Sequence, residues 1–324
     1  MLAALRRAGL ARADEAPRAE PLAGGVSSDI WRIDLARGPV CVKQALPRLR
    51  VGERWEAPVE RNRYEYEWFR TAGAAVPDAV PRVLAQADGF FVMEYLEPST
   101  HPVWKQKLRA GEGEPAFATR VGEALAAIHS ATARRDDLAR LFSTDDIFYA
   151  IRLEPYLVFT GERHPDLSEP LGELVRRTAA TKHCLVHGDV SPKNILAGPR
   201  GPVFLDAECA WYGDPAFDLG FCLNHLLLKC LWVRDAQAAF LACFDALTRA
   251  YLAGASWENP IALEGRTAAL LPGLLLARVD GKSPVEYLTS ERDKRFVRDF
   301  ARRFLLRPPS TLAALREAWR ESLR

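Results

Sequence analysis

The sequence lacks the features that mark secreted, membrane-spanning or metal-thiolate proteins. Its six cysteines include no C-x-x-C pair, and most of them lie inside apolar runs, which is typical of reduced and buried thiols. The longest apolar run, at 268–277, contains proline and glycine and is too short to cross a bilayer. Arginines interrupt the N-terminal apolar stretch, which is unlike a signal peptide. We therefore expect a cytoplasmic protein with no membrane partner.

The chain also lacks an excess of charge of either sign. Its 44 lysines and arginines and 42 aspartates and glutamates leave a formal net charge of +2, so no overall attraction to nucleic acid is expected. The arginines near the C-terminus lie at helical spacing among leucine and alanine and indicate the exposed face of a helix. The oligomeric state stays open between a monomer and a homodimer.

The 324 residues, 48% of them hydrophobic, are sufficient for one large domain or two lobes. Two strand-like segments beginning at 29–35 and separated by a turn predict a hairpin. A helix is expected at about 59–72 and a buried strand at 89–97, and the pattern is helical thereafter. We predict an α+β fold with a β-rich N-terminal lobe, 1–97, and a helical C-terminal lobe, 98–324.

The polar residues that suggest chemistry are concentrated in one segment, VHGDVSPKNILAGPRGPVFLDAE. His187, Gly188 and Asp189 are followed at a fixed distance by Asn194, and Asp206 comes after a further apolar run. This spacing matches the kinase pattern of a catalytic-loop aspartate, a metal-binding asparagine and a second metal-binding aspartate. Phosphoryl transfer needs such groups because the transferred group is anionic, so a metal must neutralise it while a base aims the attacking hydroxyl.

The segment resembles the H-G-D-x-x-x-x-N signature of the aminoglycoside phosphotransferase/choline kinase superfamily, whose members have a bilobal protein-kinase-like fold. The resemblance implies that Asp189 is the catalytic base and that Asn194 and Asp206 bind magnesium. Asp206 begins a D-x-E sequence that is similar to the one in methylthioribose kinases of this superfamily. Glu208 is therefore an expected second carboxylate ligand of the metal.

Three other residues near the motif are interpreted as non-catalytic. Asp218, in GDPAFDLG, resembles the buried aspartate of the superfamily that braces the catalytic loop through backbone hydrogen bonds. His187 is expected to brace the same loop rather than to transfer a proton. Lys193 is interpreted as a surface lysine.

Nucleotide-binding groups are expected in the N-terminal lobe. The segment LAGGVSSDIW supplies a loop that can lie over phosphates, because glycine admits a close approach of the backbone and N–H groups point at anions. Gly24, Gly25, Ser27 and Ser28 are the expected contacts. The strand that follows supplies Lys43, in the arrangement of the strand-3 lysine of kinases.

Lys43 needs a carboxylate partner on the next helix, where Glu60, Glu65 and Glu67 are available. We favour Glu65 because it shares a helix face with two aromatic residues that should pack inward, although the choice among the three stays open.

The strand FFVMEYLEP is expected to contact the adenine ring. Met93 takes the gatekeeper position, and the backbone from Glu94 to Leu96 would hydrogen-bond the base. Because backbone contacts do not depend on side-chain type, ATP is favoured over GTP through the family resemblance alone.

Several absences argue against a protein substrate. Gly188 stands where protein kinases have arginine, no A-P-E sequence is present, and the interval after Asp206 is too short for a long activation segment. A small hydroxyl-bearing acceptor, such as a sugar, thiosugar or amino alcohol, is expected. Arg152 and Arg278 are the candidate acceptor-binding residues. Arg278 stands alone where methylthioribose kinases have two adjacent arginines, which argues against methylthioribose itself.

The sequence thus predicts an ATP- and Mg²⁺-dependent O-phosphotransferase of small molecules. One alternative is an antibiotic phosphotransferase that confers resistance, although an arginine-rich C-terminus is a poor match for a polycationic aminoglycoside. The other is a non-catalytic, nucleotide-binding scaffold with a kinase fold. Pseudoenzymes typically lose the base, the lysine or the metal-binding aspartate, and this chain has all three.

Overall fold

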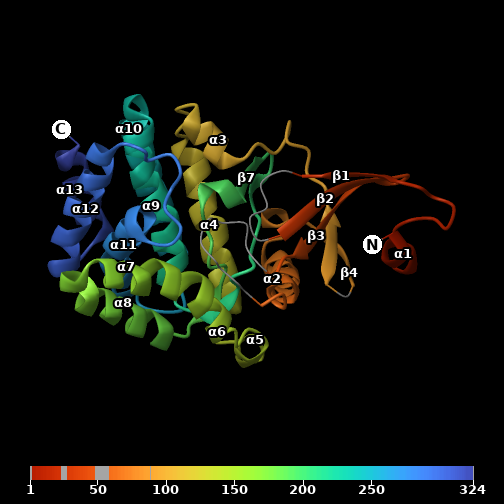
Figure 1. Ribbon diagram of the computed structural model, residues 1–324, viewed down its shortest axis with the longest axis horizontal. Helices are drawn as coiled ribbons and strands as arrows, with labels where there is room; N and C mark the ends of the chain where they lie inside the picture. The colour runs from red at the N-terminus through yellow and green to blue at the C-terminus, as the bar shows by residue number, and fades with distance from the viewer. Residues whose placement is uncertain (1, 23–27, 48–57, 88, 324) are drawn as a thin grey trace.

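The N-terminal part of the molecule is an antiparallel sheet of five strands in the order β1-β2-β3-β5-β4. The computed structural model describes residues 2–22, 28–47, 58–87 and 89–323. Figure 1 shows the sheet at one end of the molecule and the helices at the other, with the two termini far apart. The strands are β1 (Arg18–Pro21), β2 (Ser28–Leu35), β3 (Gly38–Ala45), β4 (Val83–Ala87) and β5 (Phe90–Glu94).

Side chains along each strand alternate between the two faces of this sheet, and other parts of the protein cover both faces. β2 and β3 form the predicted hairpin, and Ile33 pairs with Val40 in its register. These two residues belong to a small core that the segment around α1 (Leu2–Arg7) completes with Leu5 and Leu10. The opposite face carries Lys43, and α2 (Arg61–Ala75) covers it.

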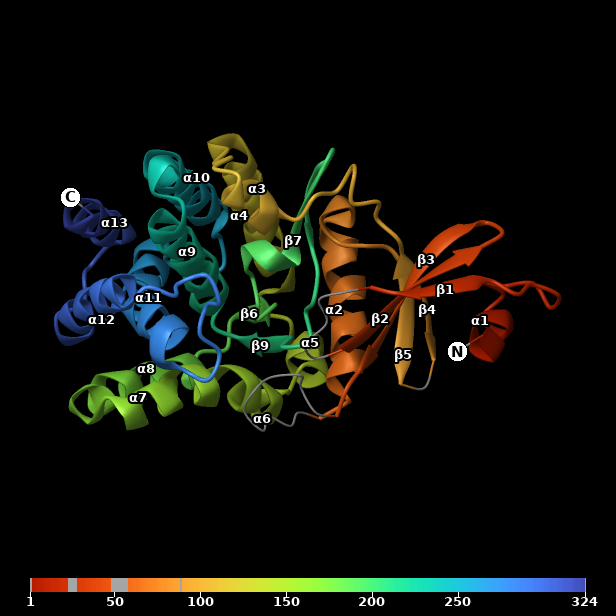
Figure 2. The same ribbon diagram turned by 45° about the horizontal axis from the view of Figure 1, so that its top comes forward.

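Helix α2 has one inward-facing stripe, because its buried residues recur at intervals of three and four. Trp68, Phe69 and Ala72 on this stripe are almost completely buried, and so is Glu65. The helix that the sequence predicts at about 59–72 is therefore present, shifted toward the C-terminus. Figure 2 shows α2 between the sheet and the helical region.

The helical region is built around α9 and α11, which pack against each other in its core. Of the described helices, α11 alone has the length and apolar composition of a membrane span, and 67% of that stretch is buried in the protein. A π-helical segment, Tyr149–Val158, contains Pro155 and lies between α6 and α7. The α-helices here are α3 (Trp104–Arg109), α4 (Pro115–Thr132), α5 (Asp136–Leu141), α6 (Asp145–Phe148), α7 (Phe159–Arg163), α8 (Ser168–Ala180), α9 (Pro215–Trp232), α10 (Gln237–Gly254), α11 (Pro260–Asp280), α12 (Glu291–Leu306) and α13 (Leu312–Ser322).

Two short antiparallel two-stranded sheets position the polar segment of the sequence. β6 (Cys184–Val186) pairs with β9 (Trp211–Gly213), and β7 (Ile195–Gly198) pairs with β8 (Gly201–Phe204). The loop 187–194 therefore connects β6 to β7, and the loop 205–210 connects β8 to β9. Figure 2 shows these strands between α2 and α9, so both loops lie where the sheet meets the helices.

Candidate active site

Lys43 joins the sheet to the helical region through two carboxylates. Its Nζ lies 2.7 Å from Glu65 Oε1, and it also pairs with Asp206 Oδ1. Lys43 is 2% exposed and Glu65 is 1% exposed, so this ion pair is formed out of contact with water. As the sequence predicts, Glu65 is the partner of Lys43, whereas Glu60 and Glu67 are not.

The charges of this cluster depend on one another. Burial alone would lower the pKa of Lys43, but Asp206 and Glu65 outweigh it and raise that pKa. Burial acts to raise the pKa of Glu65, and the ammonium group of Lys43 opposes this rise. For Asp206, burial is outweighed by Lys43 and Lys193, so its pKa is lowered and its carboxylate stays ionised.

A second ion pair holds the other carboxylate of the D-x-E sequence. Arg61, at the start of α2, donates through Nε to Glu208 Oε2 at 3.0 Å. Arg61 is 1% exposed, and it also donates to the carbonyl oxygens of Pro58 at 2.8 Å and Leu46 at 2.6 Å. Sequence reasoning does not select Arg61, although this residue lies one helical turn before Glu65 on the same buried face.

The loop 187–194 is held from behind by a buried aspartate. Asp218 accepts hydrogen bonds from the backbone N–H groups of His187 and Gly188, both at 2.7 Å, and its side chain is fully buried. His129 Nε2 lies 3.2 Å from the same carboxylate. These contacts match the bracing geometry expected for Asp218.

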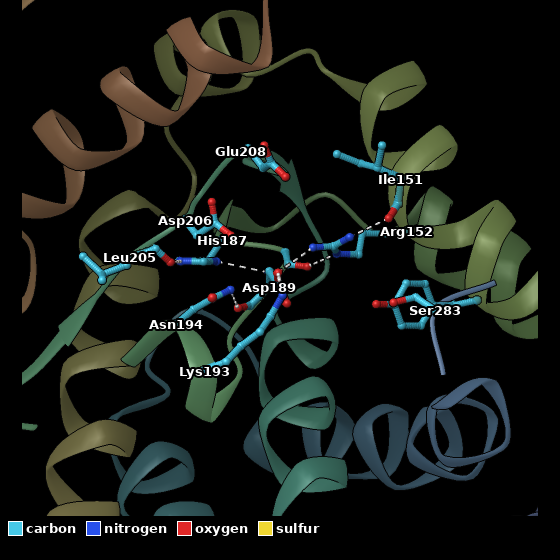
Figure 3. A network of polar contacts seen from close by, with 12 residues as sticks. Ile151, Arg152, His187, Asp189, Lys193, Asn194, Leu205, Asp206, Glu208 and Ser283 are labelled. Atoms are coloured by element: carbon cyan, nitrogen blue, oxygen red, sulfur yellow. Dashed lines mark hydrogen bonds and ion pairs between the residues drawn. The ribbon is translucent and has the colours of Figure 1, made fainter. Parts of the chain in front are cut away.

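His187 also has a structural position. Its Nδ1 accepts from the backbone N–H of Asp189 at 3.1 Å, and its Nε2 lies 3.0 Å from the carbonyl oxygen of Leu205 (Figure 3). The imidazole thus ties the two loops of the site together. Burial lowers its pKa, which favours the neutral ring that these two contacts require.

Gly188 is required by the shape of the loop. Its φ is +79°, a conformation that residues with a side chain rarely adopt. A Cβ at this position would lie 2.7 Å from Cys209 Cβ and 2.8 Å from the carbonyl oxygen of Cys209. An arginine, as in protein kinases, therefore cannot replace Gly188 without moving the backbone.

Two cations approach Asp189 from different sides, as Figure 3 shows. Arg152 Nη2 lies 3.0 Å from Asp189 Oδ2, and Lys193 Nζ lies 3.4 Å from the same oxygen. Arg152 is buried, and its Nε also donates to the carbonyl oxygen of Gly188. The structure thus places Arg152 on the aspartate itself. Lys193, interpreted from the sequence as a surface residue, also lies at the site, with its side chain half exposed.

The predicted metal ligands lie on the two loops that meet at the cleft. Asn194 Nδ2 donates to the carbonyl oxygen of Asp189 at 3.1 Å, which leaves the amide oxygen available. Among the described residues, no group of three or more His, Cys, Asp or Glu side chains is close enough to hold a metal alone. This donor set nevertheless fits Mg²⁺, which proteins usually bind through one or two carboxylates together with phosphate oxygens and water.

A cleft of about 680 Å³ lies between the sheet and the helical region. This volume is in the usual range for small-molecule sites. Its lining includes nearly all the described residues that the sequence selected: Ser28, Lys43, Glu65, Met93, Glu94, Leu96, Arg152, Asp189, Asn194, Asp206 and Glu208. Gly24, Gly25 and Ser27 lie outside the described residues.

Met93 and Glu94 occupy the end of β5 at the edge of this cleft. The backbone N–H of Glu94 donates to the carbonyl oxygen of Arg82 at 2.9 Å. That N–H is therefore already used within the sheet, and a base bound here would contact other backbone groups of the segment 94–96.

Arg278 does not line the large cleft. It is 8% exposed and donates through Nη1 to Tyr156 Oη at 3.1 Å and to Ser283 Oγ at 3.2 Å. It lines a second, smaller pocket together with Lys193, His225 and Lys229. The expected role of Arg278 at the acceptor therefore depends on that pocket.

Residues 18–260 match the sequence model of the family described as "APH: Phosphotransferase enzyme family". Methylthioribose kinase from Yersinia pseudotuberculosis is 29% identical over 219 residues, which are 59% of this chain and 53% of that enzyme. Methylthioribose kinase from Erwinia tasmaniensis is 30% identical over 219 residues, which are 59% of this chain and 54% of that enzyme. The chain therefore spans about half the length of the curated relatives it matches.

Solved structures of small-molecule kinases share the fold. A choline/ethanolamine kinase family protein from Mesorhizobium loti has a TM-score of 0.55 at 20% identity, covering 98% of this chain and 100% of that one. An amicoumacin kinase in complex with AMP-PNP and Ca²⁺ has a TM-score of 0.60 at 13% identity, covering 96% of this chain and 95% of that one. These likenesses confirm the predicted α+β, bilobal, kinase-like fold.

Proposed function

Because the chain belongs to the phosphotransferase enzyme family, we propose that it transfers the terminal phosphoryl group of ATP to a hydroxyl group of a small molecule. The observation that carries this proposal is the buried chain of ion pairs from Glu65 through Lys43 to Asp206, which faces Asp189 across one cleft. Kinases use this combination of lysine, helix glutamate and metal-binding aspartate to hold nucleotide phosphates.

Asp189 is the group that receives the proton of the acceptor hydroxyl. Its carboxylate is oriented by Arg152 at 3.0 Å and Lys193 at 3.4 Å, and the loop that carries it is fixed by Asp218. A base held in this way can orient the attacking oxygen. Positioning of this kind, together with electrostatic stabilisation, accounts for most of the catalysis of phosphoryl transfer by proteins.

Asn194, Asp206 and Glu208 are the residues that would hold Mg²⁺, which supplies neutralisation of the phosphate charge when it is bound. The AMP-PNP and Ca²⁺ in the amicoumacin kinase complex support a nucleotide and a divalent cation as cofactors. Lys43 contributes by contacting phosphate oxygens, since its ammonium lies on the wall of the cleft beside Asp206.

The acceptor side of the cleft is cationic, which argues against aminoglycosides. Lys105, Lys193 and Arg152 line the cleft, and Arg278 lies just behind it. A polycationic drug would be repelled by these side chains, so resistance to aminoglycosides is the less favoured alternative.

The proposal is tested by measuring ADP release with Mg²⁺ and ATP over a panel of sugars, thiosugars, amino alcohols, hydroxy acids and aminoglycosides. We expect at least one acceptor of low molecular mass to stimulate ADP release. If ATP raises the melting temperature with Mg²⁺ present and none of the acceptors is phosphorylated, a nucleotide-binding scaffold is the better description.

The change Asp189→Asn should lower turnover by about 10²- to 10⁴-fold, because it removes the proton acceptor. ATP binding, followed by isothermal titration calorimetry, should change little. Because Arg152 loses its ionic partner in this variant, the melting temperature must be measured in parallel. Asp137→Asn is a suitable control, since Asp137 is exposed and pairs with Arg135 at 2.6 Å. Near wild-type turnover in Asp189→Asn would exclude the assigned role.

A further inference from the structure

A small pocket of about 20 Å³ lies beside the acceptor side of the cleft. Lys105 and Lys193 line both cavities, so the pocket and the cleft share a wall. Lys193 Nζ is also 3.4 Å from Asp189 Oδ2, which places the pocket next to the proposed base. The lining residues come from α3, α9, α11 and the two adjoining loops: Lys105, Pro192, Lys193, His225, Lys229, Arg278, Glu286 and Tyr287.

The side chains around this pocket have polar atoms with no partner. His225 Nε2, Arg278 Nε and Tyr287 Oη are buried, and none of them makes a hydrogen bond to any residue that the structure describes. His225 is 5% exposed and Arg278 is 8% exposed. Each of these atoms can donate a hydrogen bond, that of His225 in one of its two tautomers. Buried donors are rarely left unpaired, so this arrangement indicates a bound group that accepts hydrogen bonds.

Lys229 adds a buried amine to the same pocket. It is 1% exposed, and its Nζ lies 3.5 Å from the ring centroid of Tyr287 and 4.3 Å from that of Trp232. Within the described part of the chain, no carboxylate forms an ion pair with Lys229. Glu286, the acidic residue of the lining, is paired with Lys105. Burial and the positive charge of Lys105 lower the pKa of Lys229 to about 6, which reflects this lack of compensation.

We propose that the phosphate acceptor carries a carboxylate group, which binds to Lys229, Arg278, His225 and Tyr287 while its hydroxyl group faces Asp189. This inference rests on the proposed phosphotransferase function and names the class of its substrate. A carboxylate has two oxygens with about four acceptor positions, whereas a water molecule accepts only two hydrogen bonds, so a carboxylate satisfies these donors better.

The test compares acceptors that differ only in charge. Glycerate is paired with glyceramide and glycerol, and gluconate with gluconamide and glucitol, in a panel extended to hydroxy acids of three to six carbons. With ADP release as the readout, we expect kcat/KM for the preferred hydroxy acid to exceed that of its amide and alcohol by about 10-fold or more, which corresponds to about 1.4 kcal/mol. Equal or higher values for the neutral members would overturn the inference and leave the phosphotransferase proposal intact.

Variants of the pocket identify the binding group. Lys229→Met should raise KM for the preferred hydroxy acid about 10-fold with little change in KM for ATP, and Tyr287→Phe, which removes only one hydroxyl, should raise it about 3-fold. Lys107→Met is the matched control, because Lys107 lies on α3 and pairs with Glu114 at 2.6 Å. If the pocket variants behave like this control, the carboxylate does not bind in the pocket.

Binding alone gives a readout that does not depend on turnover. The preferred member of the hydroxy-acid panel should raise the melting temperature of the wild type and of Lys107→Met, but not that of Lys229→Met. If hydroxy acids and their alcohols give equal shifts, or if no hydroxy acid shifts the wild type, the pocket holds only water and the inference fails. A failure of the phosphotransferase proposal is separate, since it appears as absence of ADP release with every acceptor class.

Discussion

The two sides of the cleft differ in whether their buried ionisable side chains have partners of opposite charge. On the side proposed for the nucleotide, Lys43 is paired with Glu65 and Asp206, and Arg61 is paired with Glu208. On the side proposed for the acceptor, Lys229 lies against aromatic rings and has no ionic partner among the described residues. A compensated cluster is complete within the folded chain, so removal of one partner is costly. An uncompensated cluster costs stability until a ligand binds, so it carries information about that ligand.

The largest expected effect on stability comes from breaking the compensated side. Lys43→Met leaves two carboxylates near each other in a buried site, and removal of one partner from a buried ion pair typically costs about 3–5 kcal/mol. The free energy of unfolding, measured by urea denaturation, should fall by about that amount. In the double variant Lys43→Met, Glu65→Leu, part of the loss should be recovered, because one uncompensated carboxylate is gone.

The matched control for the Lys43→Met variant is Lys294→Met. Lys294 pairs with Glu291 at 3.0 Å on the surface of α12, where an ion pair is worth about 0–1 kcal/mol. If Lys43→Met is no more costly than this control, or if the double variant loses as much as both single changes together, the buried cluster is not the stabilising unit described above.

Asp218 shows a third way to compensate a buried charge, through backbone N–H groups instead of a cation. In Asp218→Asn one oxygen becomes an NH₂ group, so the N–H of His187 or that of Gly188 faces another donor. An unsatisfied buried donor costs about 1–3 kcal/mol, and the free energy of unfolding should fall by that amount.

Turnover should fall as well in Asp218→Asn, because the same loop carries Asp189. The exposed change Asp137→Asn serves again as the control for thermal stability and activity. An Asp218→Asn protein with wild-type stability would mean that the loop 187–194 is fixed by other contacts.

The difference between the two sides of the cleft also explains which site residues could be predicted from the sequence. The sequence predicts the positions of Lys43, Glu65 and Asp218, because each lies at a fixed offset within a single strand, helix or loop that local patterns describe. Arg152 is a predicted acceptor-binding residue, and its guanidinium group contacts Asp189. Asp189 lies on an element distant in the sequence, and no local spacing reports such a contact.

On the acceptor side the sequence predicts Arg152 and Arg278, but not the two lysines near them. Lys193 was interpreted as a surface lysine, whereas its ammonium lies 3.4 Å from Asp189 Oδ2. Lys229 was not selected at all, although a lysine inside the apolar run LLLKCLW is an unusual feature that could have drawn attention. The pocket combines three helices with two loops, so its composition depends on tertiary packing and not on spacing along the chain.

Lys229 provides an expected effect in the opposite direction to that of Lys43. Burial and Lys105 lower its pKa to about 6, with a further contribution from Arg278 and an opposing one from Glu286. His225 lines the same pocket and contributes no positive charge, because burial holds its own pKa well below the usual value. The unfolded chain, in which a lysine has a pKa of about 10.4, therefore holds a proton that the folded protein lacks between roughly pH 6 and 10.

The loss of this proton on folding costs stability, and the cost falls as the pH rises through this window, by up to about 1.4 kcal/mol per pH unit. Lys229→Met removes the cost, so the variant should be the more stable protein near neutral pH, and its advantage should shrink as the pH approaches 9. Urea denaturation of both proteins at pH 7, 8 and 9 measures the difference. If the free energies of unfolding of the two proteins change with pH in parallel, Lys229 is charged in the folded protein as it is in the unfolded chain. Its charge is then compensated without a ligand.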